Sequence, residues 1–156
     1  MKVFLLSSFL FLYNFVSLAS VQIKDIFYNL SLEDSTAEVT HRPSFFYLGA
    51  IDIPSVVGYN GVKYKVTSIG ARAFHNCVGI TTINIPNTVM SIGNDAFRGC
   101  SKLTSITIPS SVKSIGGSAF WLCPELNSIV VEPDNKDYDS RGNSNAIIKT
   151  SDNMLM

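Results

Sequence analysis

The sequence has few charged residues and no excess of either sign. Asp, Glu, Lys and Arg make up only 15% of its 156 residues, with 12 acidic and 12 basic side chains that form no long blocks. A nucleic-acid surface needs clustered Lys and Arg to neutralise phosphates, and a polybasic membrane patch needs the same residues. We therefore expect no nucleic-acid partner and no charged membrane-binding surface.

Residues suited to catalysis or metal binding are also scarce. The two histidines, His41 and His75, lie in different segments, and neither stands in a recognisable triad arrangement with Ser, Cys or Asp. The acidic residues are scattered, so nothing predicts two carboxylates converging in a cleft for glycosidic chemistry. The sequence thus predicts no catalytic residue, no metal site and no cofactor.

One polar segment near the C-terminus resembles a calcium-binding loop in part. Asp137, Asp139 and Gly142 take positions 1, 3 and 6 of such a loop. Position 5 should supply a ligand but is Arg141, and position 12, where a glutamate closes the site, is Ile148. A polar connecting loop is the better interpretation.

Long apolar runs are absent except at the N-terminus. Lys2 precedes an apolar run over residues 3–16, and Ser17-Leu18-Ala19 then places small residues at the −3 and −1 positions of a cleavage site. This order is typical of a secretory signal peptide, whereas a membrane-spanning anchor needs about 20 apolar residues. We expect export to remove residues 1–19 and to leave a secreted or cell-surface chain with no membrane insertion after cleavage.

An internal repeat occupies much of the remaining sequence. Comparing the chain with itself at an offset of 23 aligns three copies of one pattern, in which Ile-Gly, Ala-Phe, a Cys, an aliphatic residue and a short aliphatic strand follow one another. The three copies of Ile-Gly begin at Ile69, Ile92 and Ile115. A period of this length is the signature of a solenoid, in which stacked units share one core.

The residues of one unit predict its local structure. Ile80, Ile83 and Ile85 have the L-x-x-L-x-L spacing of a strand whose alternate residues point inward. Gly93 permits a tight corner, and residues 94–98 predict a single helical turn. The expected fold is a solenoid with a parallel β-sheet, one strand per 23-residue coil and short helical turns.

The pattern I-G-x-x-A-F-x-x-C-x-x-L-x-x-I-x-I-P resembles the BspA-type leucine-rich repeats of bacterial and some protist surface proteins. The resemblance runs from about Ile51 to Ile148, and only the third unit departs from it, where Val131-Glu132-Pro133 delays the proline by one residue. It implies an exported, non-catalytic binding module for protein–protein interaction or adhesion, with an extracellular or cell-surface protein such as a host-matrix component as partner. The alternative is a repeat fragment of a larger exported protein whose catalytic or attachment domain lies beyond Met156.

The segment before the repeats differs in kind. Apolar and polar residues alternate over residues 26–32 and 36–40, which predicts a hairpin, and Asn60-Gly61 predicts a second tight turn. We expect residues 20–66 to form an antiparallel β-cap. Residues 67–135 would then be three repeats, and residues 136–156 an incomplete further repeat or a C-terminal tail.

The three cysteines occupy one position in successive units, 23 residues apart. Side chains stacked in this way point in parallel, which disfavours the torsion of a disulfide, and cysteine is often buried as a small hydrophobe. We expect a ladder of free, buried, structural thiols.

The outward side of the predicted strands is the only candidate binding face. Its residues alternate with the inward aliphatic ones and are mostly Ser, Thr and Asn, without charge or aromatic rings: Thr82, Asn84, Ser105, Thr107, Ser128 and Val130. Solenoids commonly bind partners on such a face, yet interface hot spots favour Trp, Tyr and Arg. Two interpretations stay open at this point, a shallow hydrogen-bonding face of weak affinity or a ladder that only favours strands.

Overall fold

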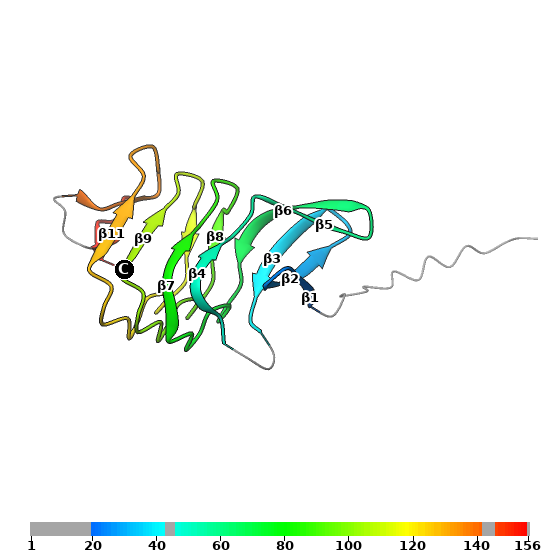
Figure 1. The fold of residues 1–156 in the computed structure, drawn as a ribbon. Helices are drawn as coiled ribbons and strands as arrows, with labels where there is room; N and C mark the ends of the chain where they lie inside the picture. The colour runs from blue at the N-terminus through cyan, green and yellow to red at the C-terminus, as the bar shows by residue number, and fades with distance from the viewer. Residues whose placement is uncertain (1–19, 43–45, 142–145, 156) are drawn as a thin grey trace, which may run out of the picture.

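The structure is a computed structural model that describes residues 20–42, 46–141 and 146–155. The predicted signal peptide and Gly142 of the partial calcium-loop pattern lie outside these residues. Within the described part, a β-rich N-terminal segment stands at one end of a row of stacked coils (Figure 1). No helix of that part is long and apolar enough to cross a membrane.

The N-terminal segment is built from a three-stranded meander and a separate hairpin. β1, β2 and β3 form an antiparallel meander, and β5 pairs antiparallel with β6. Asn60 and Gly61 both have positive φ, 48° and 79°, as the predicted two-residue hairpin turn requires. The bounds are β1 Val21–Ile23, β2 Ile26–Ser31, β3 Thr36–Thr40, β5 Val56–Tyr59 and β6 Val62–Ile69.

The sequence predicts an antiparallel cap, whereas the strand pairing in the structure is antiparallel only in part. β3 runs parallel to β6, and β4 (Leu48–Asp52) runs parallel to β7 (Gly79–Asn84) of the repeats. The pairing is mixed because β3 lies beside β6 on one side of the first coil and β4 lies beside β7 on the other side. The sheet order β1-β2-β3-β6-β8-β10 therefore passes from the N-terminal segment into the repeats without a break.

Each of the two central coils contributes two strands, where the sequence predicts one. One side carries the longer strands and the other carries two-residue strands, and partners in successive coils are 23 residues apart, as in Ser91 with Ser114 and Ser105 with Ser128. The longer strands form two ladders, β4–β7 and β9–β11. The bounds are β8 Ser91–Ile92, β9 Ser105–Ile108, β10 Ser114–Ile115 and β11 Ser128–Val131.

The predicted helical turns are absent from the described residues, and hydrogen-bonded turns replace them, in which Ala96 N donates to Gly93 O and Arg98 N to Asp95 O. Asp95 has a positive φ of 54°, and from there alternate amides leave the coil: Asp95 N donates to Gly117 O at 3.0 Å and Phe97 N to Ala119 O at 2.8 Å. In a helix these amides would donate to carbonyls of the same helix. Pairing with the next coil therefore overrides the local helical preference.

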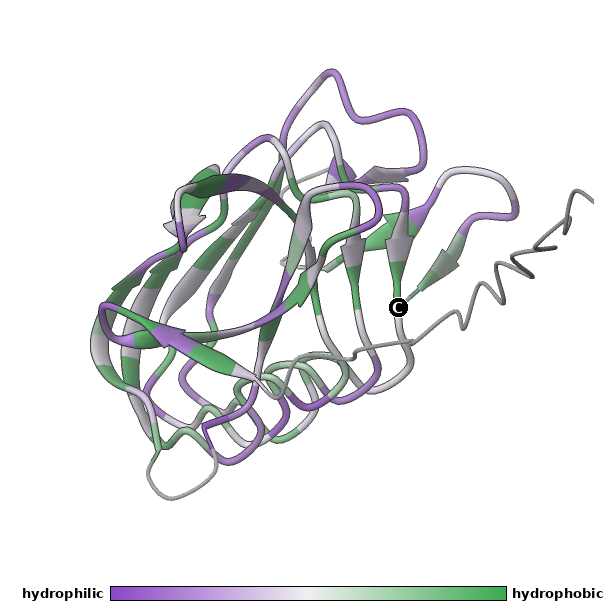
Figure 2. Ribbon diagram, turned by 90° about the vertical axis from the view of Figure 1, so that its right-hand side faces the viewer, coloured by the Kyte–Doolittle hydropathy of each residue, from purple (hydrophilic) through white to green (hydrophobic). Residues whose placement is uncertain are grey.

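The core is a continuous stack of like side chains. The inward Ile80, Ile83 and Ile85 are all buried, as predicted. The rings of Phe74, Phe97 and Phe120 stack in succession, with centroids 5.3 and 5.4 Å apart. Hydrophobic stretches follow the strands, while many connecting loops are hydrophilic (Figure 2).

A small antiparallel sheet follows the last coil. Its three strands, β12, β13 and β14, pair in that order. Asn135 attaches the start of this segment to the coils, because its buried amide donates to the carbonyls of Pro109 and Val112 at 2.8 and 3.0 Å. The bounds are β12 Tyr138–Asp139, β13 Ile148–Lys149 and β14 Met154–Leu155.

Gly93 is required for a different reason from the one the sequence suggests. Its φ is not in the left-handed region, so the corner does not depend on backbone freedom. A Cβ at this position would instead lie 2.8 Å from the Cα of Ala71 in the preceding coil, and still closer to its nitrogen. Gly93 thus allows two backbones to approach closely, and Gly116 repeats this role against Asn94.

Replacing Gly93 by Ala should destabilise the protein by about 1–3 kcal/mol, because the new methyl group meets backbone that cannot move aside alone. Gly117→Ala is the matched control, since a Cβ there would meet nothing within 4 Å and should change stability by no more than about 0.5 kcal/mol. Urea unfolding of both variants measures the difference. Equal stability of the two variants would contradict the close approach at Gly93.

Candidate binding face

The outward residues of the longer strands form two exposed columns. Thr82, Ser105 and Ser128 make the first column. Asn84, Thr107 and Val130 make the second. All six are exposed, as the alternation predicts, while their role in binding stays a prediction.

Two residues that the repeat analysis missed extend these columns into the N-terminal segment. Ala50 pairs with Thr82, and Asp52 pairs with Asn84. The Asn84 Nδ2 donates to the Asp52 Oδ1 at 2.7 Å, which joins the two strands across the face. An extra stretch before Ile69 places these partners 32 residues apart, so a search at an offset of 23 passes over them. The segment Ile51-Asp52-Ile53-Pro54 resembles the strand of the repeat, and this resemblance could have indicated that both residues belong to the columns.

The face also carries more charge than the sequence suggests. A hollow of about 520 Å³ opens on it, bordered by Asp52, Asn84, Thr107 and Glu132 among others. The Glu132 Oε2 accepts a hydrogen bond from the Ser110 amide at 2.7 Å, which places this carboxylate beside the column. The hollow therefore offers two carboxylates, an amide and the hydroxyls of Thr82 and Thr107, a set suited to a partner that donates hydrogen bonds.

The three cysteines are free thiols stacked as a ladder, but Cys123 is only half-buried, whereas the sequence predicts that all three are buried. The Cys100 Sγ donates to the Phe74 carbonyl at 3.2 Å, and the Cys123 Sγ to the Phe97 carbonyl at 3.1 Å, in each case across to the preceding coil. Burial raises the pKa of all three thiols. A protonated, buried thiol is a hydrogen-bond donor and a poor nucleophile, so the ladder is structural.

The two histidines border one hollow although they are far apart in the sequence. His41, His75 and Cys77 all border a space of about 490 Å³ beside the N-terminal segment. The Cys77 thiol points to the His75 carbonyl, at 3.9 Å, and its raised pKa opposes activation as a nucleophile. Among the described residues, no group of three or more His, Cys, Asp or Glu is placed to hold a metal ion.

Arg141 pairs with the carboxylate of Asp139, which the partial calcium-loop pattern would need as a ligand. Its guanidinium donates to both oxygens of Asp139, and this contact lowers the pKa of Asp139. The Asp139 carboxylate is therefore already paired with a cation of the same chain. Asp139 itself lies in β12, so the segment is not the simple connecting loop that the sequence predicts.

Comparison with known proteins finds one family and several similar structures. The model of the BspA type leucine-rich repeat region matches residues 60–150 in six copies, which is more than half of the chain. No curated protein matches.

Among solved structures, a leucine-rich repeat protein from Bacteroides capillosus is 25% identical with a TM-score of 0.54, over 72% of this chain and 98% of that one. Another from Bacteroides ovatus is 30% identical with a TM-score of 0.45, over 70% and 40%. A leucine-rich cell surface protein from Faecalibacterium prausnitzii is 18% identical with a TM-score of 0.41, over 86% and 59%.

The thiol ladder should make stability fall with rising pH. An unfolded cysteine ionises near pH 8.5, whereas burial keeps the folded thiols protonated. Above about pH 8.5 the unfolded chain loses protons that the folded chain retains, so its stability decreases. Melting temperatures measured between about pH 7.5 and 9.5, below the ordinary pKa of tyrosine, should fall, and Cys100→Ala should fall less steeply. Identical slopes for parent and variant would show that the Cys100 thiol is not held protonated.

Proposed function

Because the chain belongs to the BspA-type leucine-rich repeat family, we propose that it is an exported, non-catalytic module that binds other proteins. Its partner is an extracellular or cell-surface protein, and a component of a host matrix is the case that we propose to test. Binding takes place on the two polar columns of the longer strands. The observation that carries the proposal is the exposure of these columns, which are in register within each of the two ladders, Asp52 with Asn84 and Thr107 with Val130.

The chemistry of the columns supports recognition by hydrogen bonds. Ser, Thr and Asn side chains both donate and accept, and Asp52 and Glu132 add acceptors at the hollow. A parallel register repeats the same spacing from coil to coil, so an extended segment of a partner could contact several coils at once. Without aromatic anchors on the columns, each contact is weak, and affinity depends on the number of contacts made together.

The proposed location of the protein outside the cytoplasm is inferred from its N-terminal sequence. Residues 1–19 act as a signal peptide, and residues 20–66 form a cap, followed by three repeats over residues 67–135 and by an incomplete further repeat or a tail over residues 136–156. After cleavage the chain is secreted or held at the cell surface. The sequence order of Lys2, an apolar run and Ser17-Leu18-Ala19 supports this part of the proposal.

A pair of substitutions on the columns tests the binding face. Thr107→Arg places a long cation at the centre of the second column, and Ser105→Arg does the same in the first. Binding of the purified chain to an adsorbed basement-membrane extract is measured by surface plasmon resonance. The double variant should bind about tenfold more weakly or not at all, because the new side chains displace a partner from the face.

The matched control carries the same change on the other side of the coils. Ser114 is exposed on β10, in the sheet that does not contain the columns, so Ser114→Arg should leave binding unchanged. Circular dichroism of all variants verifies that they keep the fold. Absence of saturable binding by the parent, or an equal loss in Ser114→Arg, would contradict the proposed function.

A further inference from the structure

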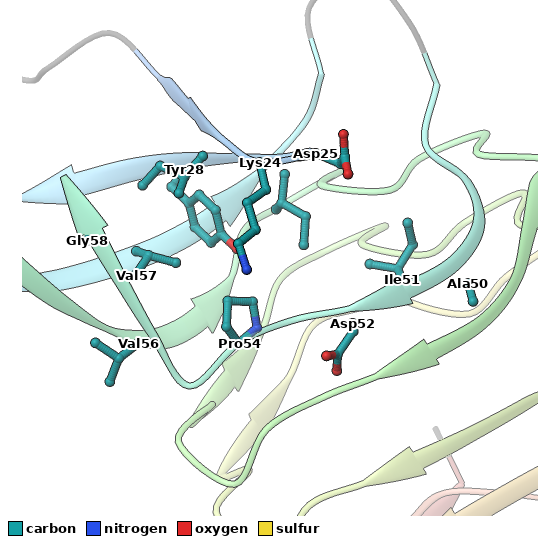
Figure 3. A pocket seen from close by; sticks show the side chains of 12 residues that line it. Lys24, Asp25, Tyr28, Ala50, Ile51, Asp52, Pro54, Val56, Val57 and Gly58 are labelled. Carbon is teal, nitrogen blue, oxygen red and sulfur yellow. The ribbon is translucent and has the colours of Figure 1, made fainter.

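A third hollow lies in the N-terminal segment and adjoins the end of the binding face, since Ala50 and Asp52 border both. It has a volume of about 550 Å³ and opens between the β1–β2 turn and the β4–β5 connection (Figure 3). Much of its wall is apolar, and three charged side chains, Lys24, Asp25 and Asp52, border it. Volume and lining are within the range of small-ligand sites. The apolar wall residues are Ile23, Ile26, Ala50, Ile51, Pro54, Val56 and Val57.

Tyr28 brings an unpartnered hydroxyl to this hollow. The residue is only 1% exposed, its ring lies among the labelled residues of the hollow (Figure 3), and no hydrogen bond to its hydroxyl exists within the described residues. Tyr47 shows the usual situation, since its hydroxyl accepts from the Phe27 amide and donates to the Thr40 carbonyl, both at 2.9 Å. Among the described residues, Thr88 Oγ1 is the one buried side-chain polar atom without a partner, so the Tyr28 hydroxyl oxygen opens on the hollow and is free to donate to a ligand there.

The protonation state of Tyr28 defines what it can offer. Burial raises its pKa, and the nearby Tyr47 hydroxyl and Asp52 carboxylate raise the pKa further. The hydroxyl therefore stays protonated at neutral pH and can donate a hydrogen bond. An anionic acceptor would gain most from such a donor.

Lys24 supplies a cation next to this donor. It lies in the two-residue turn between Ile23 and Ile26, with a positive φ of 54° that lysine rarely adopts. The Gln22 side-chain amide donates to the Lys24 carbonyl at 2.8 Å and so holds the turn in place. The Lys24 ammonium turns toward the side of the hollow where the Tyr28 ring lies (Figure 3), and it forms no ion pair with any described residue.

We propose that this hollow binds a monocarboxylate carried on an apolar group, with the carboxylate received by the Lys24 ammonium and the Tyr28 hydroxyl. The apolar group packs on Ile26, Ile51 and Val57 in the wall. Asp25 and Asp52 border the same hollow and their charges oppose any anion in it, so the carboxylate has to lie at Lys24, the one cation among the described lining residues, and a second negative charge would have no cation to pair with. The ligand is either a free acid or the C-terminus of a peptide that ends in an apolar residue. This inference does not depend on the binding face.

N-acetyl-leucine is the first probe, and N-acetyl-leucinamide is its uncharged counterpart. In an NMR titration of the purified chain, the acid should shift the amide signals of Val57 and Gly58 and saturate, and the leucinamide should bind at least about tenfold more weakly. Tyr28→Phe and Lys24→Met should each weaken binding of the acid about tenfold or more. Tyr28→Phe removes only an unpartnered oxygen, so the fold should persist.

Lys102→Met is the control, because Lys102 is exposed in the repeats and remote from the hollow, and it should bind N-acetyl-leucine like the parent. A tetrapeptide ending in leucine separates the two sources. Binding at least as tight as the acid indicates a peptide C-terminus, and exclusion of the peptide indicates a free acid. Preference for 3-methylbutylamine over the acid, unchanged binding by Tyr28→Phe, or no binding of the acid would each overturn the proposal.

Discussion

Hydrogen bonds between successive coils are the constraint on which the rest of this structure depends. Phe74 N donates to Ala96 O, and Phe97 N donates to Ala119 O, each at 2.8 Å. These bonds recur at equivalent positions because successive repeats have the same length, so the 23-residue period keeps the coils in register. Close backbone approach follows from the same bonds, and it explains why Gly93 and Gly116 carry no side chain.

This register determines the arrangement of side chains both inside and outside the coils. Inside, it stacks the phenylalanine rings and aims each thiol of Cys100 and Cys123 at a carbonyl of the preceding coil. Outside, it aligns like positions into columns, which is why a polar residue at one strand position becomes an exposed row. The binding face is therefore a consequence of the packing, and any partner must match its repeat distance.

Much of the fold could be predicted from the sequence because each position of the repeat occurs three times. The inward isoleucines, the thiol ladder and the Asn60-Gly61 turn all follow from spacing and residue type. The turns at residues 94–98 could not be predicted, since the residues with positive φ at equivalent positions, Arg72, Asp95 and Ser118, share no backbone preference. Their conformation depends on amides that pair with another coil, and local sequence does not reveal such partners.

The candidate sites show the same division. Alternation along the strands places Thr82 and Thr107 on the surface, whereas Asp52 joins them only because β4 pairs with β7 across an irregular stretch of sequence. The hollow beside Tyr28 depends on a turn and two connections that meet only in the folded chain. Sites within the repeat are thus predictable from its period, and sites in the N-terminal segment require the structure.

Amide hydrogen exchange at three equivalent phenylalanines tests the coil-to-coil pairing most directly. Phe74 N and Phe97 N donate to the next coil, while Phe120 N has no acceptor among the described residues. The account predicts slow exchange at Phe74 and Phe97 and exchange at least about a hundredfold faster at Phe120. Equal exchange at all three positions, as turns closed within their own coil would produce, would contradict it.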